Sequence, residues 1–226
     1  MSSVSSRSFS SSILPLLSLA DPGYSKEGGL DPLGLYAIGD TLGVRLVPGV
    51  RERMSDPRYL TIMAVGMAVC DGLDPEQLGA DGKSEPWQVF EWYVVEGLVR
   101  AHGDGDYVRG LPGVEKGRAA VRNGLPLAAS NYLKTPQVFG FHGVYRGLGE
   151  GLELFDDAGL LPLGWELVKA WEEDQGLVGF HGADGAHAAM RDSLQRAVNA
   201  GLEQGATDRS PGWSGWGFIA EHLAPG

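Results

Sequence analysis

Positively charged side chains gather in one part of an otherwise acidic chain. The 226 residues carry 18 Lys and Arg against 29 Asp and Glu, a net charge of −11. Residues 115–146 reverse this balance, with five basic side chains and one acidic one. Lysine and arginine bind phosphate groups through charge-assisted hydrogen bonds. Because the chain as a whole repels a phosphate backbone, contact with nucleic acid must come from this local cluster, which consists of Lys116, Arg118, Arg122, Lys134 and Arg146.

The segment HGADGAH is the clearest candidate for metal binding. It places His181, Asp184 and His187 three residues apart, and imidazole and carboxylate groups are ligands for zinc and related metals. However, the segment is rich in glycine and lacks a fourth ligand, and Asp184 is better explained as the cap of a helix expected over residues 186–202. We therefore expect no metal and no other cofactor.

Other catalytic patterns are weak. The stretch RGLGEGLE has alternating glycines, but a dinucleotide-binding loop follows a strand and precedes a helix, which is the reverse of the order expected here. No serine stands in a Gly-x-Ser-x-Gly turn. The consecutive carboxylates Glu172, Glu173 and Asp174 point in different directions on a helix and indicate a solvated face. The sequence thus favours a non-enzymatic protein, with a metal-dependent enzyme as the least favoured alternative.

Proline after a capping residue marks the start of several expected helices, because a helix can begin there without losing a hydrogen bond. Such starts occur at residues 31–32, 56–57 and 84–86. The segment from Tyr59 to Cys70 has almost no polar face and should be the central buried helix. Apolar residues that resemble strands occur only in LELF and GLLPL, on either side of an acidic turn, and predict one short hairpin. The expected fold is mainly α, with this hairpin as its β element.

The stretch from Thr135 to Leu177 has the most specific pattern in the chain. Thr135 and Pro136 begin an expected helix up to Leu152, with apolar residues at spacings of three and four on one face. The hairpin follows, and then a second helix expected to begin at Gly164. This order of helix, hairpin and helix resembles the winged-helix family of helix-turn-helix domains over about residues 112–176, in particular through GLELFDDAGLLPLGWELVKAW.

In the winged-helix family, the helix before the wing enters the major groove of DNA, and basic residues beside it hold phosphates. The resemblance implies that Gln137, His142 and Arg146 face the bases. It also implies that the phosphate backbone is held by Lys116, Arg118, Arg122 and Lys134. Five glycines in the expected helix and the acidic pair Asp156–Asp157 in the wing depart from the family pattern, since they weaken a helix and repel phosphate. A winged helix that docks on a protein is therefore the alternative.

A second resemblance covers about residues 29–70. The stretch GLDPLGLYAIGDTLGVRLVPGVRERMSDPRYLTIMAVGMAV is similar to uncharacterised proteins encoded beside bacterial phage-defence genes. The shared features are a Leu-Gly, a Pro-Gly and an Arg-Tyr pair, here at residues 42–43, 48–49 and 58–59. This resemblance brings no chemistry with it, but it implies a subunit of a bacterial antiviral defence system.

The expected organisation has four parts. These are a flexible Ser-rich arm (1–28), a helical domain (29–110), a winged-helix-like domain (111–205) and a C-terminal tail or linker (206–226). Cys70 is the only cysteine, so the chain forms no internal disulfide, which favours the reducing cytoplasm. No apolar run is long enough to cross a bilayer. The sequence predicts a cytoplasmic nucleic-acid-binding or adaptor subunit, with duplex DNA and a protein as expected partners. A purely structural interaction subunit is the alternative.

Overall fold

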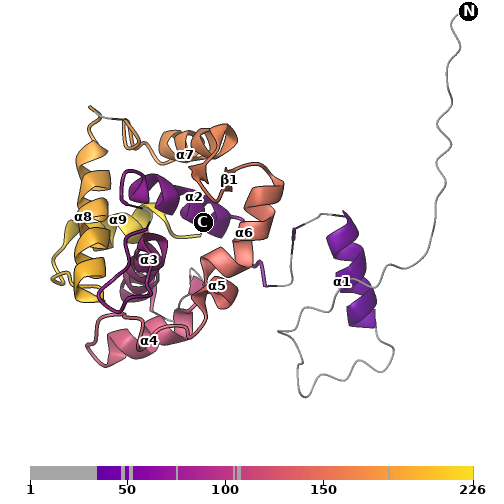
Figure 1. The fold of residues 1–226 in the computed structure, drawn as a ribbon, viewed down its shortest axis with the longest axis horizontal. Helices are drawn as coiled ribbons and strands as arrows, with labels where there is room; N and C mark the ends of the chain where they lie inside the picture. Colours follow the sequence, from indigo (N-terminus) through magenta and orange to yellow (C-terminus); the bar gives the residue numbers. More distant parts are fainter. Residues whose placement is uncertain are drawn as a thin grey trace, which may run out of the picture.

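The computed structural model describes residues 35–46, 49–50, 53–74, 76–103, 105, 108–182 and 184–225. These residues form a mainly helical protein with a two-stranded antiparallel hairpin, which confirms the expected fold class (Figure 1). The elements are α1 (Leu35–Leu46), α2 (Arg58–Cys70), α3 (Pro86–His102), α4 (Val114–Arg122), α5 (Pro136–Phe139), α6 (Phe141–Gly151), β1 (Phe155–Asp156), β2 (Gly159–Leu160), α7 (Pro162–Asp174), α8 (Ala188–Gln204) and α9 (Ser214–His222). Among the described residues, no helix is both long and apolar enough to cross a membrane.

The proline starts predicted for α2 and α3 are where these helices begin. Asp56 Oδ1 accepts a hydrogen bond from the Arg58 amide at 2.7 Å. In α3, Pro86 stands at the first helical position, where its missing N–H is not needed. Glu85 and Gln88 cap each other's backbone amides in a reciprocal capping box, and Gln88 Oε1 accepts from the Glu85 amide at 2.9 Å. The start expected at residues 31–32 lies outside the described residues.

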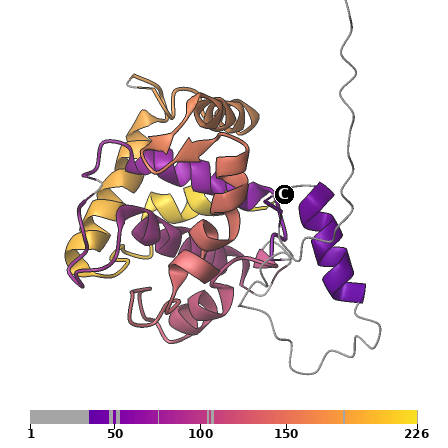
Figure 2. The same ribbon diagram turned by 45° about the vertical axis from the view of Figure 1, so that its right-hand side comes forward.

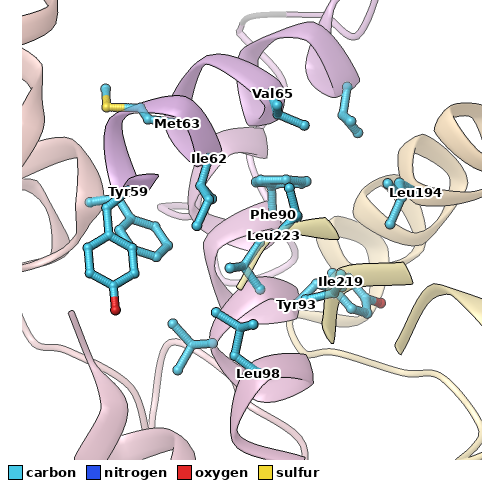
Figure 3. Packing of buried hydrophobic residues seen from close by; sticks show 14 of the residues in the cluster. Tyr59, Ile62, Met63, Val65, Phe90, Tyr93, Leu98, Leu194, Ile219 and Leu223 are labelled. Atoms are coloured by element: carbon cyan, nitrogen blue, oxygen red, sulfur yellow. The ribbon is translucent and has the colours of Figure 1, made fainter. Parts of the chain in front are cut away.

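The core is built around two helices, α2 and α3. In α2, Tyr59, Ile62, Val65 and Val69 are completely buried, as expected, whereas Cys70 at its end is half-buried. α3 is buried from Pro86 to Val99 with the exception of one half-buried side chain, because α2, α4, α8 and α9 pack around it. The central position is therefore shared, and α3 is the more enclosed helix. Figure 3 shows side chains from α2, α3, α8 and α9 meeting in one interior.

One hydrophobic cluster runs through the described body, residues 53–225. It includes side chains from both sides of the expected boundary at residues 110–111, such as Val95 and Val144. Residues 206–225, expected as a tail or linker, contain α9, which packs along α3 and buries Trp216, Ile219 and Leu223. The close packing of α9 depends on Gly97, since a Cβ atom there would lie 2.8 Å from Cγ2 of Ile219. The expected arm, residues 1–28, lies outside the described residues.

The helix expected from Pro136 to Leu152 is wrong in one respect, because it is broken at Gly140 into α5 and α6. Gly140 has an extended backbone (φ −84°, ψ −175°) and serves as the N-cap of α6. A side chain at this position would collide with the carboxylate of Glu91, which reaches in from α3. As a result, Val138 on α5 is exposed, although it was expected on the apolar face together with Phe141 and Tyr145, which are buried.

The short hairpin is confirmed, with Phe155 opposite Leu160 and Asp156 opposite Gly159. Two helix starts differ from expectation. α7 begins at Pro162, two residues before Gly164, because proline suits the first turn of a helix. α8 begins at Ala188 without a side-chain cap, so the capping role expected for Asp184 is wrong.

Candidate functional site

Helix α4 displays three of the predicted phosphate-binding side chains. Its inner face consists of small residues, Gly117 and Ala120, which allow close packing on α3 and turn the long basic side chains outward. Lys116 and Arg122 are exposed. Arg118 is half-buried, pairs with Glu115 Oε1 at 2.6 Å and also donates to the carbonyl of Gly103 at 3.3 Å.

The loop after α4 and the short helix α5 carry two more predicted residues. Lys134 and Gln137 are both exposed. Figure 1 shows α5 lying between α4 and α6, so these three helices follow one another along the body. Lys116, Arg122 and Lys134 form no ion pair with any other described residue.

His142, predicted to face a base, is instead held against the protein surface. Its ring stacks on Trp87 of α3 with ring centroids 4.3 Å apart and planes inclined by 22°. Burial, together with the nearby charge of Arg146, lowers the pKa of His142 to about 4, so the ring is neutral at pH 7. A neutral, stacked imidazole adds no positive charge to the surface.

Arg146 is likewise engaged within the protein. Its Nε donates to Glu150 Oε1 at 2.5 Å, its Nη1 lies 2.9 Å from His142 Nε2, and its Nη2 pairs with Asp157. Asp157 belongs to the acidic turn of the hairpin, which was expected to oppose phosphate. The structure shows that this turn neutralises the arginine predicted to read bases. Arg146 and His142 therefore lie together, but their polar atoms are directed at protein groups.

Sequence reasoning missed a buried carboxyl group at the centre of this region. Glu91 lies on α3 and is almost completely buried. Its Oε1 accepts from the hydroxyl of Tyr132 at 2.6 Å, and its Oε2 accepts from the amide of Phe141 at 3.0 Å, at the start of α6. Burial raises the pKa of Glu91 to about 8, although both hydrogen bonds act in the opposite direction. The one signal in the sequence that could have found Glu91 is that it interrupts an otherwise apolar helix face.

A second buried glutamate, Glu96, joins α3 to two distant segments. Its Oε1 forms an ion pair with Arg100 Nη2 at 2.7 Å. Its Oε2 accepts hydrogen bonds from the Leu127 amide at 3.2 Å and from the hydroxyl of Thr207. The spacing of Glu96 and Arg100, one helical turn apart, is visible in the sequence. The contacts with Leu127 and Thr207 are not.

The two histidines of the segment HGADGAH contact other protein groups. No three side chains that could hold a metal ion come together among the described residues. His187 Nδ1 lies 3.3 Å from the carbonyl of Val178, while His181 Nδ1 pairs with Glu172 on α7. The solvated face predicted for Glu172 is therefore wrong, because this carboxylate is buried and also accepts from the Gly179 amide at 2.5 Å.

Helix α1 has a different character from the rest of the protein. Leu35, Ile38, Leu42 and Leu46 are spaced by three or four residues, so they lie on one face, and each is more than half exposed. In Figures 1 and 2, α1 stands apart from the body. It is connected to the body at Gly49, whose backbone lies against Leu148 of α6.

Comparisons with known proteins give no relative for this chain: no family model, curated protein or solved structure matches it. The resemblances to winged-helix domains and to proteins of phage-defence gene clusters thus stay predictions.

Proposed function

We propose that the protein is a non-enzymatic adaptor subunit that docks on a partner protein through α1. The observation that carries this proposal is the exposed apolar face formed by Leu35, Ile38, Leu42 and Leu46. A helix with apolar side chains at these spacings is the usual form of a segment that binds in a hydrophobic groove. The 12 residues of α1 give a length of about 18 Å, which suits a groove of moderate size.

We expect the apolar face of α1 to bind in a groove on another protein. We do not expect it to pack against the α1 helix of a second copy. Burial of one Leu or Ile side chain contributes about 1.5–3 kcal/mol. At about 25 cal/mol per Å², this corresponds to roughly 60–120 Å² of apolar surface removed from water. Two α1 helices packed face to face would therefore bury roughly 500–1,000 Å² in total. A stable interface buries about 1,200–2,000 Å². A groove encloses more of the helix and reaches this range.

The charge of the chain favours a basic partner. Residues 147–176 hold eight acidic side chains and one basic one. Part of this charge is compensated by Arg146, which pairs with Glu150 and Asp157, but exposed carboxylates remain. These are Glu153, Asp156, Glu166 and Glu173. A field of one sign accelerates association with a partner of opposite charge. Residues 29–70 resemble proteins encoded beside phage-defence genes. From this resemblance we infer that the protein acts in the cytoplasm as part of a bacterial defence system.

The test begins by identifying the partner and then measures its affinity. A photo-reactive residue at Ile38 of the full chain should cross-link one protein in the native host. With that protein purified, Leu42→Asp should weaken binding by at least about tenfold, since burial of one leucine contributes about 1.5–3 kcal/mol. Val178→Asp is the matched control, because Val178 is an exposed apolar residue in the loop between α7 and α8. Equal loss in both variants would contradict docking through α1. So would cross-linking to a second copy of the chain with a dimer seen in sedimentation.

As a second candidate function, we propose contact with a nucleic-acid backbone through Lys116, Arg122 and Lys134. The supporting observation is that these three cations are exposed and form no ion pair among the described residues. The engagement of His142 and Arg146 within the protein favours binding without base readout. Three phosphate contacts predict a plot of log K against log salt with a slope of about −2.7 on duplex DNA.

Charge reversal tests this candidate. The triple change of Lys116, Arg122 and Lys134 to Glu should abolish duplex binding while leaving the melting temperature unchanged, because these side chains lie on the surface. Asp157→Asn should tighten binding, since it releases Arg146 and removes a negative charge. Absence of duplex binding by the unmodified protein at low salt would eliminate nucleic acid as a partner.

A further inference from the structure

The position of α1 is limited by a short connection to the body. Leu46 is the last residue of α1, and Gly49 lies against α6, where a Cβ atom on this glycine would be 3.0 Å from Cα of Leu148. The chain from Leu46 to Gly49 can span at most about 10–11 Å. The C-terminal end of α1 therefore lies within this distance of the point where the chain meets α6. Figures 1 and 2 both show α1 on the side of the body where α6 lies.

The chain after Gly49 is fixed to the body by further contacts. The guanidinium of Arg53 lies over the ring of Phe139 on α5, 4.9 Å from its centroid. The hydroxyl of Tyr145 on α6 donates a hydrogen bond to the carbonyl of Asp56 at 3.0 Å. Because these contacts follow one another along the chain, the point from which α1 projects is part of the packed body.

This short connection determines how close a partner of α1 comes to the body. A helix with its side chains is about 10–12 Å across, and a groove wall is at least one such layer thick. A partner layer of this thickness around Leu46 therefore reaches the surface of α6. The four apolar side chains of α1 offer roughly 240–480 Å² for burial, whereas a standard interface buries about 800 Å² on each partner. Contact with the body beside α6 adds to the smaller area.

The surface that such a partner meets is apolar, with one acidic side chain at its edge. Val50 is exposed and directly follows Gly49. Leu152 is exposed at the end of α6, and its amide donates to the carbonyl of Leu148 at 3.0 Å. It therefore lies one helical turn from the contact with Gly49. Glu153 comes next, exposed and without an ion pair among the described residues. We call Val50, Leu152 and Glu153 the α6-end surface.

Glu153 is held in a backbone conformation that is unfavourable for glutamate. Its φ of 56° is the only positive φ of a non-glycine residue in the described part of the chain. This left-handed conformation commonly ends a helix, and glycine adopts it without strain. The stability of the fold therefore does not account for a glutamate at this position. A strained and exposed carboxylate points to a contact outside the chain.

We propose that the protein bound by α1 also covers the α6-end surface, and that a lysine or arginine of this partner pairs with Glu153. The proposal rests on docking through α1. It describes the partner as a protein whose apolar groove for α1 continues into an apolar shoulder with a basic residue at its edge. The charge of residues 147–176, with eight acidic side chains and one basic one, has the sign that attracts such a partner.

The experiment measures how variants of the full chain bind the purified protein that cross-links through Ile38. Leu152→Ser should weaken binding by roughly three- to tenfold, because about half of this leucine is open to burial. Leu78→Ser is the matched control and should bind normally, since Leu78 is equally exposed but lies in the loop that contacts α8.

Glu153→Gly separates binding from stability. It should weaken binding by about two- to fivefold through loss of an exposed ion pair. It should also raise the melting temperature by about 2–4 °C, because glycine relieves the strained φ. Weaker binding by a more stable protein cannot result from unfolding.

The inference requires both losses of affinity. Normal binding by Leu152→Ser or by Glu153→Gly, together with weakened binding by Leu42→Asp, would overturn it and leave docking through α1 intact. An equal loss in Leu78→Ser would overturn it as well. Normal binding by Leu42→Asp would instead refute docking through α1 itself, so the two failures are distinguishable.

Discussion

Replacing Glu91 by Gln tests whether the buried carboxyl group of α3 carries a proton in the folded protein. Burial raises its pKa from 4.5 to about 8. Between these values the folded chain holds a proton that the unfolded chain has released, so the free energy of unfolding falls as the pH rises through this window. Above pH 8 both states are ionised and the loss is complete. One pKa unit corresponds to about 1.4 kcal/mol, so the total loss reaches about 4–5 kcal/mol.

Glutamine keeps the size of the side chain and its acceptor for the Phe141 amide, but it is neutral at every pH. We expect urea unfolding to give similar stabilities for the unmodified protein and Glu91→Gln at pH 5. By pH 8 the variant should be the more stable protein, with a difference that grows by about 1.4 kcal/mol per pH unit at most. Glu203→Gln, an exposed position on α8, should follow the unmodified protein at every pH.

Parallel stability curves for the unmodified protein and Glu91→Gln would refute this reasoning. Such a result would mean that the Tyr132 hydroxyl and the first amide of α6 stabilise an ionised carboxylate as well as water does. In that case Glu91→Gln should also be less stable at every pH, because it would remove a charged hydrogen-bond acceptor.

Three further predictions concern the core and its cysteine and carboxylate groups. Gly97→Val should lower the free energy of unfolding in urea by about 1–3 kcal/mol, because the new side chain would collide with α9. Gly217→Ala is the control and should not lower it, because a Cβ atom at that position meets no other atom within 4 Å. Although Cys70 is half-buried as a whole residue, burial of its thiol raises the pKa to about 12. Because the thiolate is the reactive form, Cys70 should resist dithionitrobenzoate at pH 8 until the protein is unfolded. Burial opposes ionisation of Glu172, but its hydrogen bonds with His181 and Gly179 outweigh this and lower its pKa. Glu172→Gln should therefore destabilise at pH 7, and the difference should shrink as the pH falls below about 4.5.

The helices could be predicted from the sequence because their signals are local. Asp56 and Pro57 lie directly before α2, and Pro86 follows a capping residue at the start of α3. The hairpin was predicted for the same reason, since two apolar stretches flank an acidic turn with Gly159 at positive φ (130°). Each of these features needs only a few neighbouring residues.

The break at Gly140 and the state of the predicted site could not be predicted, because they depend on residues far apart in the chain. Glu91 is about fifty residues from Phe141, whose amide it accepts, and nothing near Gly140 announces a carboxylate. Likewise, Arg146 and Asp157 were both visible as charges, but only the fold shows that they pair. A count of charges over residues 115–146 therefore overstated the positive charge that is available to a ligand.

Internal contacts explain why α1 is a better candidate for partner binding than the predicted base-reading pair, His142 and Arg146. Glu91, Glu96 and Glu172 each join a helix to a distant loop or helix start, so these three carboxylates are satisfied internally. Arg146 and His142 are satisfied internally as well, and a ligand would have to break their contacts before it gained new ones. The side chains of Ile38, Leu42 and Leu46 on α1 are more than half exposed, so docking removes their apolar surface from water. Binding free energy is thus available at α1 without loss of any interaction that holds the body together.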